Sequence, residues 1–193
     1  MSRIGKQPIP MPDAVKVAVN ARSVQVEGPK GKLNWEVPVG IRVDVDAAEK
    51  MIKVARADDT RQQKAFHGLS RALIANMVKG VAEGYEQKME VFGAGYGVKL
   101  QGKELSLTVG TATPAKLTVP SGVEVNIETP NARGNDEPAR LTLTGPDKQQ
   151  LFEFAARIKR VRPPEPYHGK GIRYAGEHIR RKVGKAFSSG GAA

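Results

Sequence analysis

Short stretches of the chain alternate apolar and polar residues, which is the pattern of strands buried on one face. One of the clearest reads "EVPVGIRVDVD" (Glu36 to Asp46), and a second reads "TVPSGVEVNIE" (Thr118 to Glu128). Both contain Val-Pro-x-Gly followed by apolar residues at every second position, which predicts a turn leading into a strand. The chain therefore carries an internal repeat.

The surroundings of the two copies also correspond. A hairpin-like pair of alternating stretches precedes each copy, and one more alternating stretch and a helical pattern follow it. The apolar positions of these flanking stretches are Val24, Val26, Leu33, Trp35, Val37, Ile52 and Val54 in the first copy, and Leu105, Leu107, Val109, Leu117, Val119, Leu141 and Leu143 in the second. Two copies of one sheet-plus-helix unit predict an α+β fold built by tandem duplication of a small antiparallel sheet packed on one helix.

The first helix is predicted to begin at the capping-box spacing Thr60-x-x-Gln63 and to end at Gly80 and Gly84. Steps of three and four residues give its expected buried face: Phe66, Leu69, Leu73, Met77 and Val81. A new strand, "YEQKMEVF", follows. We therefore place a domain boundary near Gly84 and expect an N-terminal repeat over 1–83, a C-terminal repeat over 84–164 and a basic tail over 165–193.

The second helix is predicted to begin near Asp147, again with a glutamine three residues later. It must end before Pro163-Pro164, because proline cannot continue a helix and disfavours the helical conformation of the residue before it. Its expected buried residues are Leu151, Phe154, Ala155 and Ile158.

Positive charge is concentrated near the end of the chain. The formal net charge is +11 with a pI near 9.9, which favours a polyanionic partner. Ten basic residues stand against two acidic ones between Arg157 and Lys185, so this segment carries +8. Because like charges this dense repel one another, we expect the segment to be poorly ordered until a counter-charge binds.

Several classes of site find no support. The absence of cysteine excludes disulfides and thiolate metal ligands. The three histidines are scattered, and we expect His67 to be a partly exposed surface residue, so no metal or other cofactor is expected. Neither a membrane-spanning run nor a secretory signal is seen, which makes a cytoplasmic protein the expectation. No nucleophile or acidic pair has a catalytic setting, so we expect no enzyme.

Two glycine-rich motifs fit structural roles better than phosphate binding. In "FGAGYGVKL" (Phe92 to Leu100) the glycine spacing is wrong for a dinucleotide fingerprint and a strand follows instead of a helix. "GPKGK" (Gly28 to Lys32) lacks the spacing of a phosphate loop and the flanking helices of a KH domain. We expect closely packed glycines in the first and a hairpin turn in the second.

The stretch "PPEPYHGKGIRYAGEHIRRKVGKAF" (Pro163 to Phe187) has the features of a surface that binds folded RNA. Its glycines allow close approach of the backbone, its tyrosines offer planar faces, and its cations continue the charged face of the second helix. The residues expected to neutralise phosphates are Lys159, Arg160, Arg162, Lys170, Arg173, Arg180, Arg181, Lys182 and Lys185.

This stretch closely resembles the C-terminal signature of the bacterial large-subunit ribosomal protein six family. The start "MSRIGKQPIPMP" resembles the family's opening, and "NWEVP", "QQKAFHGLSRALIANMVKGV" and "VFGAGYGVKL" follow in the expected order, so the resemblance covers essentially the whole chain. It implies a duplicated α+β fold and a structural protein of the large subunit that binds 23S rRNA near the sarcin-ricin region and the base of the stalk that recruits translational GTPases. Neighbouring large-subunit proteins are implied partners, with the GTPases in proximity.

By the same resemblance, six residues take over the role of the signature: Tyr167, Gly169, Lys170, Gly171, Arg173 and Tyr174. The first repeat carries a smaller net charge than the basic segment, +5 against +8, so we expect it mainly to pack against other ribosomal components, with Arg3 and Lys6 as lesser RNA contacts.

Three alternatives remain open on the residues themselves. A free RNA or DNA chaperone shares the electrostatics but would not cosediment stoichiometrically with large subunits. A nucleic-acid-processing enzyme would need catalytic residues that the sequence does not reveal. Attachment to an anionic membrane lacks an apolar face, since Ile179 and Val183 stand nearly alone in the tail.

Overall fold

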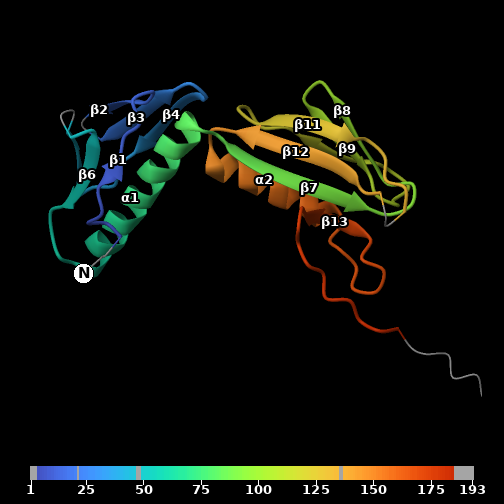
Figure 1. Cartoon of the computed structure of the whole chain (residues 1–193). Coiled ribbons are helices and arrows are strands. Elements are labelled where there is room, and N and C mark those ends of the chain that lie inside the picture. Colours follow the sequence, from blue (N-terminus) through green and yellow to red (C-terminus); the bar gives the residue numbers. More distant parts are fainter. Residues whose placement is uncertain (1–3, 21, 47–48, 135–136, 185–193) are drawn as a thin grey trace, which may run out of the picture. The chain divides into compact units, whose positions relative to one another are not determined.

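The computed structural model describes residues 4–20, 22–46, 49–134 and 137–184. Its contacts divide the chain into two compact units, each with its own sheets and helix (Figure 1). The first comprises Met1–Glu86, Ser121–Glu124 and Thr144–Phe152, and the second comprises Gln87–Pro120, Val125–Leu143 and Glu153–Ala193.

The first unit contains two antiparallel three-stranded sheets and one long helix. One sheet has the order β2-β3-β4, with strands Lys16–Asn20, Ser23–Gly28 and Gly31–Glu36. The other has the order β1-β6-β5, with strands Ile9–Pro10, Met51–Arg56 and Ile41–Asp46. The helix is α1, Arg61–Ala82.

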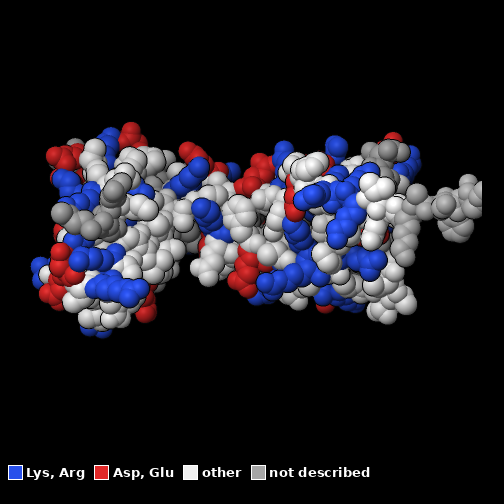
Figure 2. Space-filling model, turned by 90° about the horizontal axis from the view of Figure 1, so that it is seen from below, with Lys and Arg blue, Asp and Glu red and all other residues white. Residues whose placement is uncertain are grey.

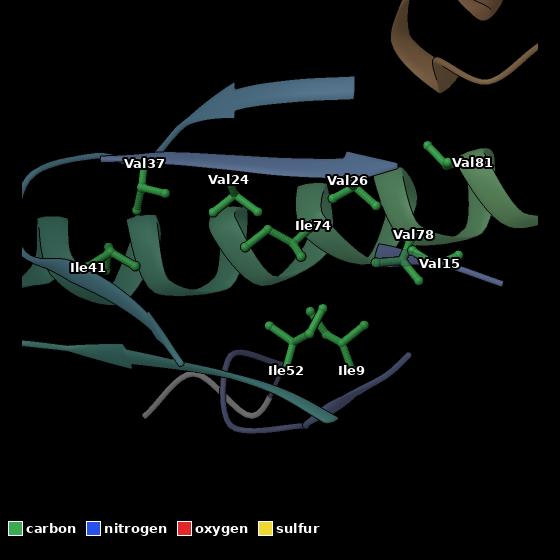
Figure 3. Packing of buried hydrophobic residues seen from close by; sticks show 10 residues of the cluster. All are labelled: Ile9, Val15, Val24, Val26, Val37, Ile41, Ile52, Ile74, Val78 and Val81. Carbon is green, nitrogen blue, oxygen red and sulfur yellow. The ribbon is translucent and has the colours of Figure 1, made fainter. Parts of the chain in front are cut away.

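A core of aliphatic side chains joins α1 to both sheets (Figure 3). Val24 and Val26 reach it from β3, Ile52 and Ile9 from β6 and β1, and Ile74 from the middle of α1. Four of these side chains are fully buried and Ile9 is 2% exposed. The predicted alternation of β3 and β6 is thereby confirmed.

Helix α1 begins where the capping spacing predicts. Thr60 is the N-cap, and its hydroxyl oxygen accepts a hydrogen bond from the Gln63 amide at 3.3 Å. At the other end, Gly84 follows the C-cap with φ +85°, a conformation that glycine adopts without strain. Gly80, in contrast, is buried within the helix, so the prediction that it ends the helix is wrong.

The inner face of α1 is rotated from the one that we predicted. The structure buries Ser70, Ile74 and Val78, together with Val81, whereas Leu69 is 48% exposed. Phe66 and Met77 are only partly buried against the core. Sheets flank the helix on more than one side, so its apolar face is wide. The prediction relied on the largest apolar side chains, and these do not lie at the centre of the buried face.

His67 lies on this inner face and is not the partly exposed residue that we expected. It is 3% exposed, and its Nε2 lies 2.9 Å from the Val54 carbonyl oxygen. Its Nδ1 lies 3.1 Å from a guanidinium nitrogen of Arg56. Since arginine can only donate, Nδ1 is the acceptor and the ring proton resides on Nε2, which donates to Val54. His67 therefore joins α1 to β6.

The second unit repeats this plan. One sheet has the order β11-β12-β7-β13, and a second has the order β10-β9-β8. The strands are β7 Tyr85–Phe92, β8 Gly97–Gln101, β9 Glu104–Thr108, β10 Ala115–Thr118, β11 Glu124–Thr129, β12 Ala139–Gly145 and β13 Gly171–Tyr174. Helix α2, Lys148–Val161, runs along the four-stranded sheet (Figure 1).

The structure confirms the duplicated α+β fold. Val-Pro-x-Gly precedes β5 in one copy and β11 in the other, and its glycines, Gly40 and Gly122, have nearly the same φ, +86° and +89°. The two glycine-rich motifs are also structural. Gly28 pairs with Gly31 across a hairpin turn, and a side chain at Gly93 would collide with the ring of Tyr96.

Helix α2 follows its prediction closely. The Asp147 carboxylate accepts hydrogen bonds from the Gln149 and Gln150 amides at 2.8 and 3.5 Å, so it caps the helix. All four residues expected on the buried face are at most 2% exposed, namely Leu151, Phe154, Ala155 and Ile158. The helix ends at Val161, before the two prolines, and brings the basic segment to the sheet.

Candidate nucleic-acid interface

The first part of the basic segment is folded into the second unit. Strand β13 pairs antiparallel with β7, with Gly171 opposite Phe92 and Tyr174 opposite Met89. Ile172, in the middle of β13, is fully buried. The expectation that this segment is poorly ordered before binding is therefore wrong for β13, because one buried apolar residue and a paired sheet edge offset the charge repulsion.

The chain on both sides of β13 is held by backbone hydrogen bonds. In the loop after α2, the Glu165 amide donates to Lys170 O at 2.8 Å and the Gly169 amide donates to Glu165 O at 3.0 Å. After β13, the chain returns to this loop, where the Lys182 amide donates to Pro166 O at 2.9 Å. The basic residues thus project from two adjacent stretches of defined backbone.

Two signature glycines serve this backbone. Gly169 and Gly171 are both buried, with φ of +73° and +133°. A methyl group on Gly171 would lie 2.7 Å from the carbonyl oxygen of Pro163 and 2.8 Å from Cα of Pro164. A glycine is therefore required at position 171 because the backbone of Pro163 and Pro164 packs closely against it. The close approach is made by the chain itself and not by a bound partner.

Glu177 ties the basic segment to α2. The Lys159 ammonium donates to both of its carboxylate oxygens, at 2.6 and 2.7 Å, and the Tyr174 amide donates to Oε2 at 3.1 Å. Lys159 Nζ also lies 4.6 Å from the centroid of the Tyr174 ring, a cation–π distance. Two of the expected RNA contacts, Lys159 and Tyr174, thus already have partners within the fold.

Acidification is expected to weaken the hydrogen bonds that Glu177 accepts from Lys159 and the Tyr174 amide. The hydrogen bond from Lys159, followed by that from the Tyr174 amide, lowers the pKa of Glu177 below its ordinary value of 4.5, although burial opposes the shift. A carboxyl whose pKa is lowered on folding stabilises the fold above its unfolded pKa, and the stabilisation is lost as pH falls through the folded value. The Tyr174 amide proton resonance should therefore titrate below pH 4.5 in an NMR series.

The matched variants for this titration are Glu177→Gln and Glu124→Gln. The first should abolish the titration of the Tyr174 amide, whereas the second, at an exposed position on β11, should leave it unchanged. A Tyr174 amide that still titrates in Glu177→Gln would contradict this assignment.

Arg173 is the most enclosed cation of the signature. Its guanidinium carbon lies 3.6 Å from the centroid of the Phe92 ring, and its Nε lies 3.8 Å from Glu90 Oε2. The side chains of Arg173 and Glu90 are each 19% exposed. Arg173 is therefore held against the end of β7 and not extended into solvent.

The remaining cations form the exposed surface that we call the basic rim. None of them forms an ion pair within the part of the chain that the structure describes. The basic rim consists of Arg160, Arg162, Lys170, Arg180, Arg181 and Lys182, all exposed. Tyr167 lies among them with 53% exposure. Figure 2 shows many lysine and arginine side chains over this unit, and others scattered over the first unit.

The other expected contacts are not part of this rim. Lys6 is exposed in the first unit. Arg3 and Lys185 lie outside the described residues.

Sequence reasoning missed two acidic residues at this surface, Glu90 and Glu177. For Glu177 a signal was present, because an isolated carboxylate within a dense run of cations is positioned to organise them. Glu90 gave no such signal, because its proximity to Arg173 depends on the pairing of β7 with β13.

The described residues contain neither a membrane-spanning helix nor a cluster of metal ligands. No helix in that part of the chain is long and apolar enough to span a membrane. No group of three or more acidic and histidine side chains is arranged there to hold a metal ion.

Comparison with known proteins agrees with the architecture. The family described as Ribosomal protein L6 matches residues 11–84 and 92–175, one segment for each repeat. The chain is 46% identical over 186 residues to the large ribosomal subunit protein uL6 of Syntrophomonas wolfei, covering 96% of this chain and 98% of that protein. It is 47% identical over 186 residues to uL6 of Maridesulfovibrio salexigens, covering 96% and 99%.

A third relative shows a similar likeness. The chain is 46% identical over 186 residues to uL6 of Acaryochloris marina, covering 96% of this chain and 98% of that protein. These are ribosomal proteins, in agreement with the expectation that the chain is not an enzyme. With matches to both repeats and near-complete coverage, the chain belongs to the ribosomal protein L6 family.

Proposed function

We propose that this protein is a structural component of the large ribosomal subunit, in the cytoplasm, and binds 23S rRNA directly through its second unit. The observation that carries the proposal is the basic rim: six exposed cations without ion-pair partners in the described chain, on a backbone held by α2 and β13. Cations of this kind neutralise phosphates and release counterions.

The roles of the predicted RNA-binding residues divide according to burial. The basic rim contacts the phosphate backbone, and Tyr167 packs on a ribose or base. Lys159, Gly169, Gly171 and Tyr174 instead keep the backbone of the rim in place, because their side chains or Cα positions contact the protein itself. A surface arranged before binding loses less conformational entropy when it meets its partner.

The resemblance to the family supports a finer location. The rim contacts the RNA near the sarcin-ricin region, at the base of the stalk that recruits translational GTPases. Neighbouring large-subunit proteins lie beside the first unit, and the GTPases come into proximity without being substrates. Arg3 and Lys6 make lesser RNA contacts.

Cosedimentation tests the general proposal. The intact protein should remain at one copy per large subunit through washes of rising salt, and Arg160→Glu/Arg162→Glu should be released at lower salt because it reverses two charges of the rim. A protein that does not cosediment, or binds many RNAs without fixed stoichiometry, would support a free chaperone instead.

Directed cleavage tests the finer location. Because the chain has no cysteine, Val183→Cys provides a unique attachment point for an iron chelate that generates hydroxyl radicals. Val183 is 96% exposed beside the rim, so the label should not disturb the fold. We expect cleavage of 23S rRNA in the sarcin-ricin region, and little from a control label at Lys99→Cys on β8. Cleavage confined to other helices would overturn the location.

A further inference from the structure

Beside the basic rim, the second unit contains a hollow of about 650 Å³. It is bounded by Glu90 on β7, Arg173 on β13 and the chain from Gly176 to Arg181. The floor carries both signs of charge, whereas Arg180 and Arg181 at its border are exposed cations. Its chemistry therefore differs from that of a simple phosphate-binding surface.

The floor of the hollow contains polar atoms whose hydrogen-bonding capacity is unused. Arg173 Nε is buried and has no hydrogen-bond partner among the described residues. Glu90 Oε2 is 3.8 Å from Arg173 Nε, and Glu90 Oε1 is 3.7 Å from Arg140 Nε. These distances allow electrostatic attraction but exceed those of normal hydrogen bonds. A buried donor without a partner is costly, and a ligand that supplies the partner recovers that cost.

The neighbours of Arg173 and Glu90 restrict their movement. The guanidinium of Arg173 stacks against Phe92, and Glu90 lies on a strand paired on both sides, by β12 and β13. The second carboxylate of the hollow, Glu177, is already bonded to Lys159 and the Tyr174 amide. Glu90 is thus the carboxylate left to accept hydrogen bonds from a ligand.

The combination of Glu90 and Arg173 selects the chemistry of that ligand. A phosphate group can only accept hydrogen bonds, so the Glu90 carboxylate repels it from the floor. A nucleobase edge presents donors and acceptors together. Guanine carries the acceptor O6 next to the donors N1–H and N2–H, so the two donors match the two oxygens of Glu90 and O6 matches the arginine. Uracil offers one donor between two acceptors, which leaves a carboxylate oxygen facing an acceptor.

We infer that this hollow binds one unpaired guanine of the RNA, with its Watson–Crick edge on Glu90 and Arg173 and its flanking phosphates on Arg180 and Arg181. The inference rests on the proposed RNA binding and adds a base-specific site to it. Single-stranded bases turned out of a helix are the usual targets of sequence-specific RNA recognition, by edge hydrogen bonds and by stacking. His178, which lines the hollow, offers a ring for such stacking.

Four RNA hairpins that differ only in a single bulged nucleotide, G, A, C or U, provide the test with the full chain. The bulged G should bind about 5- to 150-fold more tightly than the bulged U, the range expected for one well-formed bidentate contact. Replacing the bulged G by inosine, which lacks the N2 amino group, should remove part of this preference without any change to the protein.

A variant of Glu90 and a matched control then test whether the preference for guanine over uracil arises in the hollow. Glu90→Gln should bring the G-to-U affinity ratio close to unity, because an amide can accept at only one atom. The ratio is used because removing a negative charge raises affinity for every RNA. The matched control, Glu104→Gln, removes an exposed carboxylate from β9 of the same unit and should leave the ratio unchanged. Circular dichroism checks that both variants fold.

An independent readout is the Arg173 Nε–H resonance during titration with guanosine 5′-monophosphate. It should shift with this nucleotide and much less with uridine 5′-monophosphate. Equal binding of all four hairpins, or no shift with the guanine nucleotide, would overturn the guanine site while leaving the electrostatic RNA binding intact. Failure to bind any hairpin would overturn the site, whereas the proposed function is decided separately by cosedimentation with the large subunit.

Discussion

Replacing Arg180, Arg181 and Lys182 together by alanine is expected to weaken binding to the 23S rRNA fragment about 100-fold at 0.1 M salt. Such a loss follows if each lost contact is worth about 1 kcal/mol. The salt dependence should change as well. If the intact protein neutralises roughly five phosphates, log K falls with log salt at a slope of about −3.5 to −4.5, and the triple variant should be shallower by about 2 to 3.

A charge-matched control separates this contact from a general attraction. Lys99, Lys103 and Lys116 are exposed on and between β8, β9 and β10 of the same unit, away from the basic rim. Replacing these three by alanine removes the same net charge but should change the slope little. Filter binding across salt concentrations measures both variants. Equal slopes for the two would show that total charge, and not the rim, determines affinity.

The second large effect is expected for Gly171→Ala. The change forces a side chain into φ +133° and presses its methyl group on the backbone of Pro163 and Pro164. The strained backbone costs about 1–3 kcal/mol and overpacking a similar amount, so β13 should detach from the sheet. Hydrogen exchange of the Ile172 amide, which donates to Arg162 O at 2.8 Å, should accelerate strongly.

Gly176→Ala serves as the control for this variant. Gly176 also has a positive φ, +77°, but a methyl group there meets nothing within 4 Å. Its cost should be about 1 kcal/mol, and exchange at Ile172 should change little. RNA affinity is expected to fall for Gly171→Ala, because detaching β13 disperses the basic rim. Unchanged protection of Ile172 in Gly171→Ala would show that the loop absorbs the methyl group.

Local patterns were enough to predict most of the fold. Alternation located β3, β6, β9 and β12, and the Val-Pro-x-Gly motifs located two equivalent turns whose glycines share a positive φ. Thr60 and Asp147 predicted the helix starts because capping depends only on residues within one turn. These features need no knowledge of distant parts of the chain.

The errors arose where distant segments decide the outcome. The inward face of α1, with His67 and Ser70 buried and Leu69 exposed, depends on sheets that come from both sides. Whether the basic segment is structurally ordered depends on the pairing of β13 with β7. Net charge directed attention to this segment, but could not separate exposed cations such as Arg180 from enclosed ones such as Arg173.

The pairing of β13 with β7 also bears on the biogenesis of the protein. Strand β7 is translated well before its partner, so a nascent chain that already contains β7 and β12 still has an unpaired sheet edge at Met89 to Phe92. Unpaired edges promote association between chains, and contacts between distant segments form slowly. Newly made copies should therefore be most prone to aggregation, and most dependent on molecular chaperones, until Gly171–Tyr174 have left the ribosomal exit tunnel.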